Sequence, residues 1–227
     1  LNLRSRYSSA SIEKMYHFDF NYGLQKLAFF SSFSKSQFGN LTMGKNGPSE
    51  YLRPNYVGIN DEGEDILIQN SNSRVQRNTA YDQVNFMQKI FYKPIENLNI
   101  DLGIHFSKSS NIPRYDRLIR NDENHVIDSG DQGLYYSEWY YGPQEWLLIN
   151  SQLTYNPKSK KIYDELKFGV AYQKFSESRN SRKFNENFLN SREEELDIFS
   201  FNLDFFKKIS QSSDITYVLE LILSLIQ

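Results

Sequence analysis

The three histidines of this chain, His17, His105 and His125, are the side chains best suited to metal binding or proton transfer. They lie far apart in the sequence, and none has a second histidine at the i, i+4 spacing that places two ligands on one helical face. His17 and His105 also fall at polar positions of alternating segments, which favours an ordinary polar role over ligation of a metal or haem iron. The sequence therefore predicts no metal site.

The acidic run "NDEGED" at 60–65 is a second candidate for cation binding. Because it lacks the ordered ligand spacing of a known calcium loop, a solvated charge run is the favoured interpretation. The chain also lacks G-x-S-x-G, H-E-x-x-H, Walker A and G-x-G-x-x-G patterns. With no cysteine, thiolate chemistry is excluded as well. We expect neither an enzyme nor a cofactor-binding protein.

Charged and aromatic residues gather in two stretches, "NIPRYDRL" at 111–118 and "YYSEWYYGPQEW" at 135–146. The arginines and aspartate can form charge-assisted bonds to neighbouring loops, the rings suit a membrane interface, and Gly142-Pro143 interrupts a strand ladder. The main interpretation is therefore architectural. Since loops also carry function, the candidate ligand contacts are Arg114, Tyr115, Asp116, Arg117, Trp139 and Tyr140. Tyr51 and Tyr56 could also stack on a ligand, although tyrosines in loops more often pack loops together.

The segments that must position these candidate residues are predicted to be β-strands. In "LNIDLGIHFS" at 98–107, apolar and polar residues alternate with a period of two, which gives a strand one apolar and one polar face. Similar alternation recurs in about nine segments. The sequence predicts an all-β fold, namely an antiparallel up-and-down meander of about nine long strands that is part of a transmembrane β-barrel of about 22 strands.

The connections between these segments differ at the two ends of the strands. Short connections are expected near 22–25, 93–97, 156–164 and 207–213, and long polar ones at 36–79, 108–134 and 176–194. Strands of about ten residues with one rim of short turns and one of long loops are typical of outer-membrane barrels. Four aromatic residues on apolar positions just before short turns predict a membrane-interface girdle: Tyr22, Tyr92, Tyr155 and Phe205.

Composition agrees with this prediction and narrows the partners. Aromatic residues make up 15% of the 227 residues, while hydrophobic residues reach only 39% and the mean hydropathy is −0.64. The net charge of −2 shows no excess of basic residues of the kind that binds nucleic acid. No segment approaches the roughly 20 apolar residues of a transmembrane helix. A soluble all-β fold would explain the alternation too, so a soluble, aromatic-rich carbohydrate-binding domain stays open.

"NIPRYDRL" followed by "YYSEWYYGPQEWLLINSQLTY" resembles the mid-barrel region of TonB-dependent outer-membrane receptors, especially the Bacteroidetes-type group related to siderophore, haem and cobalamin receptors. "LRSRYSSASIEKMYHFDFNYG" and "FSFNLDFFKK" are similar to other strands of that family. The resemblance implies location in the cell outer membrane, with the lipid bilayer, the TonB system and a small-molecule ligand of siderophore, haem or cobalamin class as partners. TonB would act through a plug domain.

The chain departs from that family in length and content. Nothing in it resembles the plug domain or a signal peptide, and about nine strands cannot close a barrel of about 22. The final "YVLELILSLIQ" is a continuous aliphatic run where the family would alternate. We expect residues 1–227 to be an internal part of the receptor barrel, truncated at both ends and not transport-competent alone. A complete small outer-membrane barrel, structural or enzymatic, is the alternative.

Overall fold

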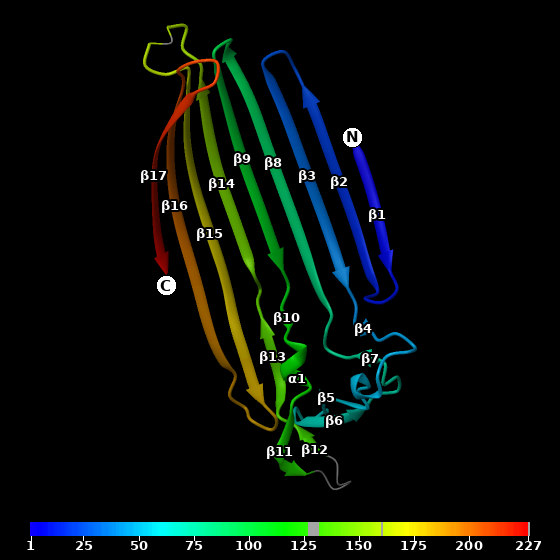
Figure 1. Ribbon diagram of the computed structural model, residues 1–227. Coiled ribbons are helices and arrows are strands. Elements are labelled where there is room, and N and C mark those ends of the chain that lie inside the picture. The colour runs from blue at the N-terminus through cyan, green and yellow to red at the C-terminus, as the bar shows by residue number, and fades with distance from the viewer. Residues whose placement is uncertain (127–131, 160, 227) are drawn as a thin grey trace.

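One antiparallel sheet of long strands forms most of the molecule (Figure 1). The computed structural model describes residues 1–126, 132–159 and 161–226, and for 122–126 and 132 the backbone alone. Within that part of the chain the nine long strands follow one another in chain order: β1 (Asn2–Ser8), β2 (Glu13–Gly23), β3 (Leu27–Phe38), β8 (Tyr81–Ile95), β9 (Leu98–Ser109), β14 (Glu145–Tyr155), β15 (Glu165–Lys183), β16 (Asn190–Lys208) and β17 (Asp214–Ile226). The predicted all-β meander of about nine long strands is confirmed.

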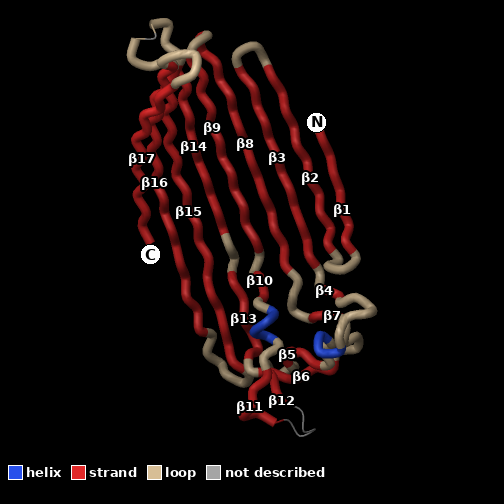
Figure 2. Tube along the Cα trace, viewed as in Figure 1, coloured by secondary structure: helices blue, strands red, loops and turns tan. Residues whose placement is uncertain are grey.

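The two ends of the sheet differ (Figures 1 and 2). Three of the long strands are joined to the next one at one end by short turns, and β14 to β15 by a longer connection. At the other end, residues 39–80 contain β4 (Leu41–Thr42), η1 (Ser49–Tyr51), β5 (Asn55–Ile59), β6 (Asp65–Gln69) and β7 (Val75–Gln76). Residues 110–144 contain β10 (Ile112–Pro113), α1 (Tyr115–Leu118), β11 (Asn121–Val126), β12 (Gln132–Leu134) and β13 (Tyr136–Tyr141). We call this end of the molecule the loop assembly.

Cross-strand register gives the sheet one apolar and one polar face. Phe18, Phe33, Phe86 and Phe106 occupy neighbouring positions on β2, β3, β8 and β9. The adjacent row, on the opposite face, is His17, Ser34, Asn85 and Ser107, in which hydrogen bonds join His17 to Ser34 at 2.7 Å and Ser107 to Asn85 at 2.8 Å. Period-two alternation in register across strands produces this separation.

The apolar face has no protein layer packed on it. Among the described residues no hydrophobic side chain is buried, and large apolar residues along the long strands are exposed, for example Phe201 at 42% and Leu102 at 44%. A soluble sheet normally buries one face against another layer. The sheet thus presents a broad apolar surface that the described part of the chain does not cover.

Charged residues end this apolar face on the side of the loop assembly. Lys108 on β9 pairs with Glu145 on β14, and Lys174 on β15 with Glu195 on β16 at 3.0 Å. Each of these residues continues the parity of the apolar positions on its strand. The apolar residues therefore form a band, which runs on β14 from Tyr155 to Leu147 and ends where the ion pairs begin.

The predicted long loop at 176–194 is wrong, because β15 extends to Lys183 and β16 begins at Asn190. The two strands keep pairing beyond the apolar band, where Ser178 faces Glu193 and Asn180 faces Ser191. Their side chains are polar on both faces there, so the apolar alternation that indicates a strand disappears although the backbone ladder continues. Only residues 184–189 connect the two strands.

The predicted interruption at Gly142-Pro143 is confirmed. β13 ends at Tyr141 and β14 begins at Glu145, while β15 pairs with both across the gap. Gly142 has a φ of 122°, and a Cβ there would lie 3.0 Å from the Asn111 Cα. Only glycine fits this combination of backbone angle and close approach. No helix in the described part of the chain has the length and apolar content to cross a membrane.

Candidate functional site

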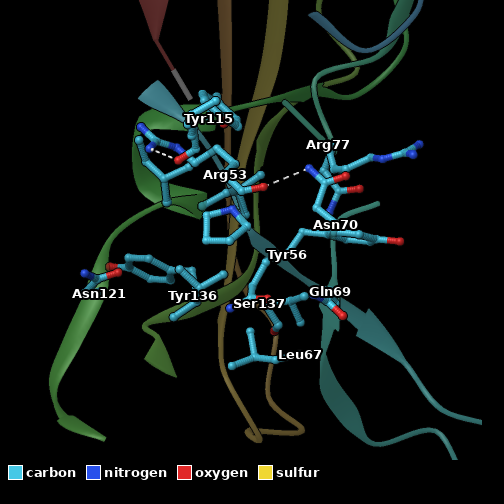
Figure 3. Close-up of a pocket in the computed structure, with 18 residues that line it drawn as sticks. Arg53, Tyr56, Leu67, Gln69, Asn70, Arg77, Tyr115, Asn121, Tyr136 and Ser137 are labelled. Atoms are coloured by element: carbon cyan, nitrogen blue, oxygen red, sulfur yellow. Dashed lines mark hydrogen bonds between the residues drawn. The ribbon is translucent and has the colours of Figure 1, made fainter. Parts of the chain in front are cut away.

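A cavity of about 890 Å³ lies within the loop assembly (Figure 3). Its walls come from residues 52–57, 67–70 and 77–78 of the loop between β3 and β8, and from residues 115–121 and 134–137 of the loop between β9 and β14. Two segments that are far apart in the sequence therefore build one concave surface. Ligand sites of small molecules typically occupy cavities of roughly this size.

One arginine holds the walls of this region in place. The Arg182 guanidinium donates to both carboxylate oxygens of Asp65, at 2.7 and 2.9 Å, and through Nε to Glu138 at 2.8 Å. The Asp65 side chain is only 1% exposed and also accepts from the Asn185 backbone N–H at 2.9 Å. Asp65 lies on β6, Glu138 on β13 and Arg182 on β15, so this loop clamp joins three separate segments.

The interpretation of the acidic run 60–65 as solvated charge is wrong for Asp65, which is buried and paired. The earlier part of the run forms the turn that leads into β6, where the Asn60 side-chain oxygen accepts from the backbone N–H of Glu62 at 3.0 Å and of Glu64 at 2.8 Å. The glutamates themselves stay exposed. Sequence reasoning missed the pairing because Arg182 is 117 positions away.

Electrostatics stabilise the charged form of both clamp partners. Burial raises the pKa of Asp65, but the hydrogen bond from Arg182, the backbone N–H of Asn185 and the charge of Arg182 outweigh burial, so this pKa lies below its ordinary value. The hydrogen bond to Asp65 raises the pKa of Arg182 further above its ordinary value. Both groups remain charged at neutral pH.

Four of the predicted ligand contacts, namely Arg114, Asp116, Arg117 and Trp139, contact one another. Arg114 donates to Asp116 at 3.0 Å and to the Tyr141 hydroxyl at 3.0 Å, and its guanidinium lies 4.9 Å from the centre of the Trp139 ring. Arg117 lies 3.7 Å from Asp116. This network organises the loop between β9 and β14, as the architectural interpretation predicted.

Tyr115 is the one predicted contact that lines the cavity among the described residues. Tyr140 and Trp139 are consecutive on β13 and so point to opposite faces of the strand. Burial and then the charge of Glu138 raise the pKa of Tyr140. Both rings lie on the loop side of the Lys108–Glu145 ion pair. Their direct role in ligand capture stays a prediction.

Two arginine–tyrosine pairs dominate the chemistry of the cavity. Arg53 lies close to Tyr115, where its charge opposes the rise in the pKa of Tyr115 that burial causes. Arg77 lies over the ring of Tyr56 at 5.8 Å. Within the described structure, the Nε atoms of both arginines are buried without a hydrogen-bond partner. Each such group costs about 1–3 kcal/mol when left unpaired.

Asn70 gives the first wall its shape. Its side-chain amide donates to the backbone oxygen of Arg53 at 2.9 Å and of Val75 at 2.8 Å, and its side-chain oxygen accepts from the Asn72 backbone at 3.3 Å. Asn70 is buried, so these bonds are shielded from water. This bracing positions Arg53 at the cavity wall.

Sequence reasoning singled out few of the cavity residues. Tyr56 was considered as a stacking residue and does line the cavity, whereas Tyr51 is not among the lining residues. Arg53 and Arg77 carried no signal, because single charged residues in a polar loop have no periodicity that indicates their direction. Tyr136 lies in the aromatic stretch 135–146 but was not selected as a ligand contact. Their common location is a product of how the two long loops fold against each other.

The predicted girdle residues all lie on the apolar face, near the end with the short turns. Tyr22 and Tyr155 lie at the ends of β2 and β14, and Tyr92 and Phe205 lie three residues before the ends of β8 and β16. Tyr22 and Tyr92 are exposed, at 51% and 43%, and Phe205 packs against Tyr163 at 5.4 Å. Whether these rings meet a membrane interface stays a prediction.

His17 and His105, the two histidines whose side chains are described, are not brought together. His17 bonds to Ser34 and, at 3.1 Å, to Asp19 on the polar face, and His105 lies 6.2 Å from the Trp146 ring. The side chain of His125 lies outside the described residues. In the part of the chain that the structure describes, no three His, Cys, Asp or Glu side chains come together as metal ligands.

No family model, curated protein or solved structure matches this chain. The resemblance of its motifs to TonB-dependent receptors therefore has no independent support from these comparisons. A functional proposal has to rest on the two faces of the sheet and on the geometry of the loop assembly.

Proposed function

We propose that this chain forms part of the membrane-spanning wall and ligand-binding loops of a TonB-dependent outer-membrane receptor. The intact receptor takes up a scarce small molecule such as an iron-siderophore, haem or cobalamin. Energy for uptake comes from the TonB system through a plug domain that the 227 residues do not contain. The observation that carries the proposal is the uncovered apolar band of the sheet.

The height of the band supports a bilayer as the partner. Along β14 the band runs from Leu147 to Tyr155, which are eight residues apart. At ~3.3 Å per residue this is ~26 Å along the strand. A strand tilted by about 35° would cross ~22 Å, close to the roughly 25 Å of the apolar band on outer-membrane barrels.

The register of the girdle supports that tilt. The row through Tyr22 reaches Ile90 on β8, two residues before Tyr92. The row through Tyr92 reaches Leu153 on β14, two residues before Tyr155. Each of these two displacements is spread over two strand steps, which is one residue per strand from β2 to β14, whereas the row through Tyr155 reaches Phe205 on β16 without displacement. A rise of ~3.3 Å for a strand spacing of ~4.8 Å corresponds to a tilt of about 35°, as expected in a barrel.

A soluble carbohydrate-binding domain is less compatible with the same surface. Exposed apolar patches above a few hundred Å² are rare on soluble monomers, and here such residues extend over all nine long strands. A complete small barrel would share the lipid-facing band with a receptor. The long, organised loops favour the receptor, because extracellular loops of that kind are where ligands are captured.

Lipid contact can be tested with single tryptophans placed on the two faces. In a Trp139→Phe, Trp146→Phe background, Phe201→Trp and Asn202→Trp would place a tryptophan on the apolar and the polar face, respectively. In vesicles of brominated lipid we expect strong quenching at position 201 and weak quenching at 202. Equal quenching at both positions, or a monomeric β-rich chain in plain buffer, would contradict the proposal.

A second experiment separates a receptor from a small barrel. Sequencing the source DNA on both sides of this reading frame should reveal an upstream plug domain and further alternating strands. A signal peptide directly before Leu1 and a stop codon directly after Gln227 would instead support a small barrel. That result would end the transport proposal while leaving the membrane location intact.

A further inference from the structure

We propose that the cavity of the loop assembly binds a hydroxyl-rich small molecule that carries carboxylate groups at separated positions. This inference rests on the proposed function, since it names the ligand class that the loops would capture. It depends on residues that the sequence analysis did not select, above all Arg53 and Arg77.

The charge of the cavity wall points to an anion. Among the described residues, the cavity lining includes two arginines and no aspartate or glutamate. Among the described residues neither Arg53 nor Arg77 forms an ion pair, whereas Arg114, Arg179 and Arg182 each do. Arg53 donates through Nη1 to the backbone oxygens of Glu50 at 2.6 Å and Leu52 at 2.9 Å, so no described carboxylate balances either guanidinium, and a ligand carboxylate can do so.

The arrangement of the two arginines points to separated carboxylates. In Figure 3 the Arg53 side chain extends to one side of the cavity, close to Tyr115, and Arg77 extends to the other side, over Tyr56. The two guanidinium groups thus point to different sides of the cavity in this view. A ligand that spans the cavity and carries an anionic group near each end satisfies both.

The space between the arginines suits hydroxyl groups. Asn55, Gln69 and Asn78 contribute side-chain amides to the cavity wall. Amides donate and accept hydrogen bonds at once, as a polyol requires. Tyr56 and Tyr136 add flat apolar surface on which a ring or carbon chain can pack. The volume of about 890 Å³ accommodates a ligand of two or three sugar units.

The loop clamp supports binding because it holds the walls together before any ligand arrives. Asp65 lies at the start of β6, which provides Leu67 and Gln69, and Glu138 follows Ser137 on β13. Arg182 ties both strands to β15. A site with preformed walls loses less conformational freedom when a ligand binds.

The test is a titration of the full chain in detergent micelles by calorimetry. Two probes represent the two kinds of hydroxylated carboxylate that could bind. Trigalacturonate is a sugar acid, and citrate is an open-chain hydroxycarboxylate. Maltotriose is the neutral control of similar size to the first. We expect at least one anionic probe to bind, maltotriose to bind at least about tenfold more weakly, and the affinity to fall with added salt.

Variants locate the binding. Arg53→Gln and Arg77→Gln should each lower the affinity for the anionic probe by about tenfold. Arg192→Gln is the matched control, because Arg192 is 74% exposed and does not line the cavity. Arg77→Lys keeps the charge but loses the planar fork, so it should recover only part of the affinity. Trp139 emission, measured for each variant in a Trp146→Phe background, checks that the loop assembly is kept.

The inference is overturned if neither anionic probe binds, if maltotriose binds as tightly, or if both cavity variants bind like the parent while retaining native Trp139 emission. These outcomes are separate from those of the lipid-quenching experiment. Quenching at position 201 together with no anion binding would refute the ligand class and leave the barrel proposal standing. Anion binding without lipid quenching would refute the barrel and leave the cavity as an anion site.

Discussion

Asp65 and Arg182 form a two-pronged ion pair at 2.7 and 2.9 Å although 117 residues separate them in the chain. The pair links the first long loop to the extended hairpin of β15 and β16, and Glu138 adds the second long loop. Parallel N–H···O bonds of this kind fix orientation as well as distance. The clamp therefore joins three segments of the loop assembly through polar contacts, and no described hydrophobic side chain there is buried.

Removing the cation should loosen the loop assembly. Arg182→Met leaves the Asp65 carboxylate buried without its partner, which we expect to cost about 3 kcal/mol in the stability of this region. The urea midpoint of Trp139 emission, measured in a Trp146→Phe background, should fall accordingly. Arg192→Met provides the control, because that side chain is 74% exposed. Equal midpoints for the two variants would show that the clamp does not hold the loops.

The clamp also makes the loop assembly sensitive to acid. The pKa of Asp65 is lower in the folded state than in the unfolded chain, so the pair contributes its full stability above the unfolded value of about 3.9 and loses it as the pH falls through the lowered pKa. The urea midpoint of Trp139 should be steady between about pH 7 and 5 and drop by pH 3. Asp65→Asn should remove this part of the dependence. An unchanged pH profile in that variant would assign the effect to other carboxylates.

Gly142→Ala should destabilise the junction of β13 and β14. The added Cβ would lie 3.0 Å from the Asn111 Cα and 3.1 Å from the Ser110 backbone oxygen, at a φ of 122° that side chains rarely adopt. We expect a loss of about 1–3 kcal/mol in the free energy of unfolding. Gly23→Ala is the control, since nothing lies within 4 Å of its Cβ. Similar midpoints would mean that the junction adjusts freely.

A lysine on the apolar face should oppose insertion into a bilayer. Phe201→Lys places a charge in the middle of the apolar band, and we expect it to cost about 2–4 kcal/mol in the free energy of folding into the bilayer. Asn202→Lys on the polar face should cost little. Urea titrations of folding into lipid vesicles measure the difference. Equal costs at the two positions would argue against a lipid-facing surface and in favour of a protein layer over it.

The strands could be predicted from the sequence because one local property specifies them. Leu98, Ile100, Leu102, Ile104 and Phe106 share a parity, and a strand must place them on one face. The prediction failed at residues 176–183 and 190–194, where both faces are polar and alternation carries no signal. Gly142-Pro143 was recognisable because proline cannot donate to a ladder.

The cavity and the clamp could not be predicted in the same way. Arg114, Asp116 and Trp139 were selected as a cluster of neighbours in the sequence, and in the structure they bind one another. Arg53 and Arg77 came together with Tyr115 only through the packing of two loops. Such contacts join residues that are far apart in the sequence, and no local sequence pattern predicts them.

The amino-acid sequence by itself determined the apolar parts of the long strands, their up-and-down order and the division of the sheet into an apolar and a polar face, because these follow from period-two alternation and from connections that differ in length at the two ends. Only the tertiary structure decided which polar side chains meet in the loop assembly. The pairing of Asp65 with Arg182 and the placement of Arg53 and Arg77 around one cavity arise from long-range geometry, in which burial and hydrogen bonding select partners irrespective of their distance along the chain.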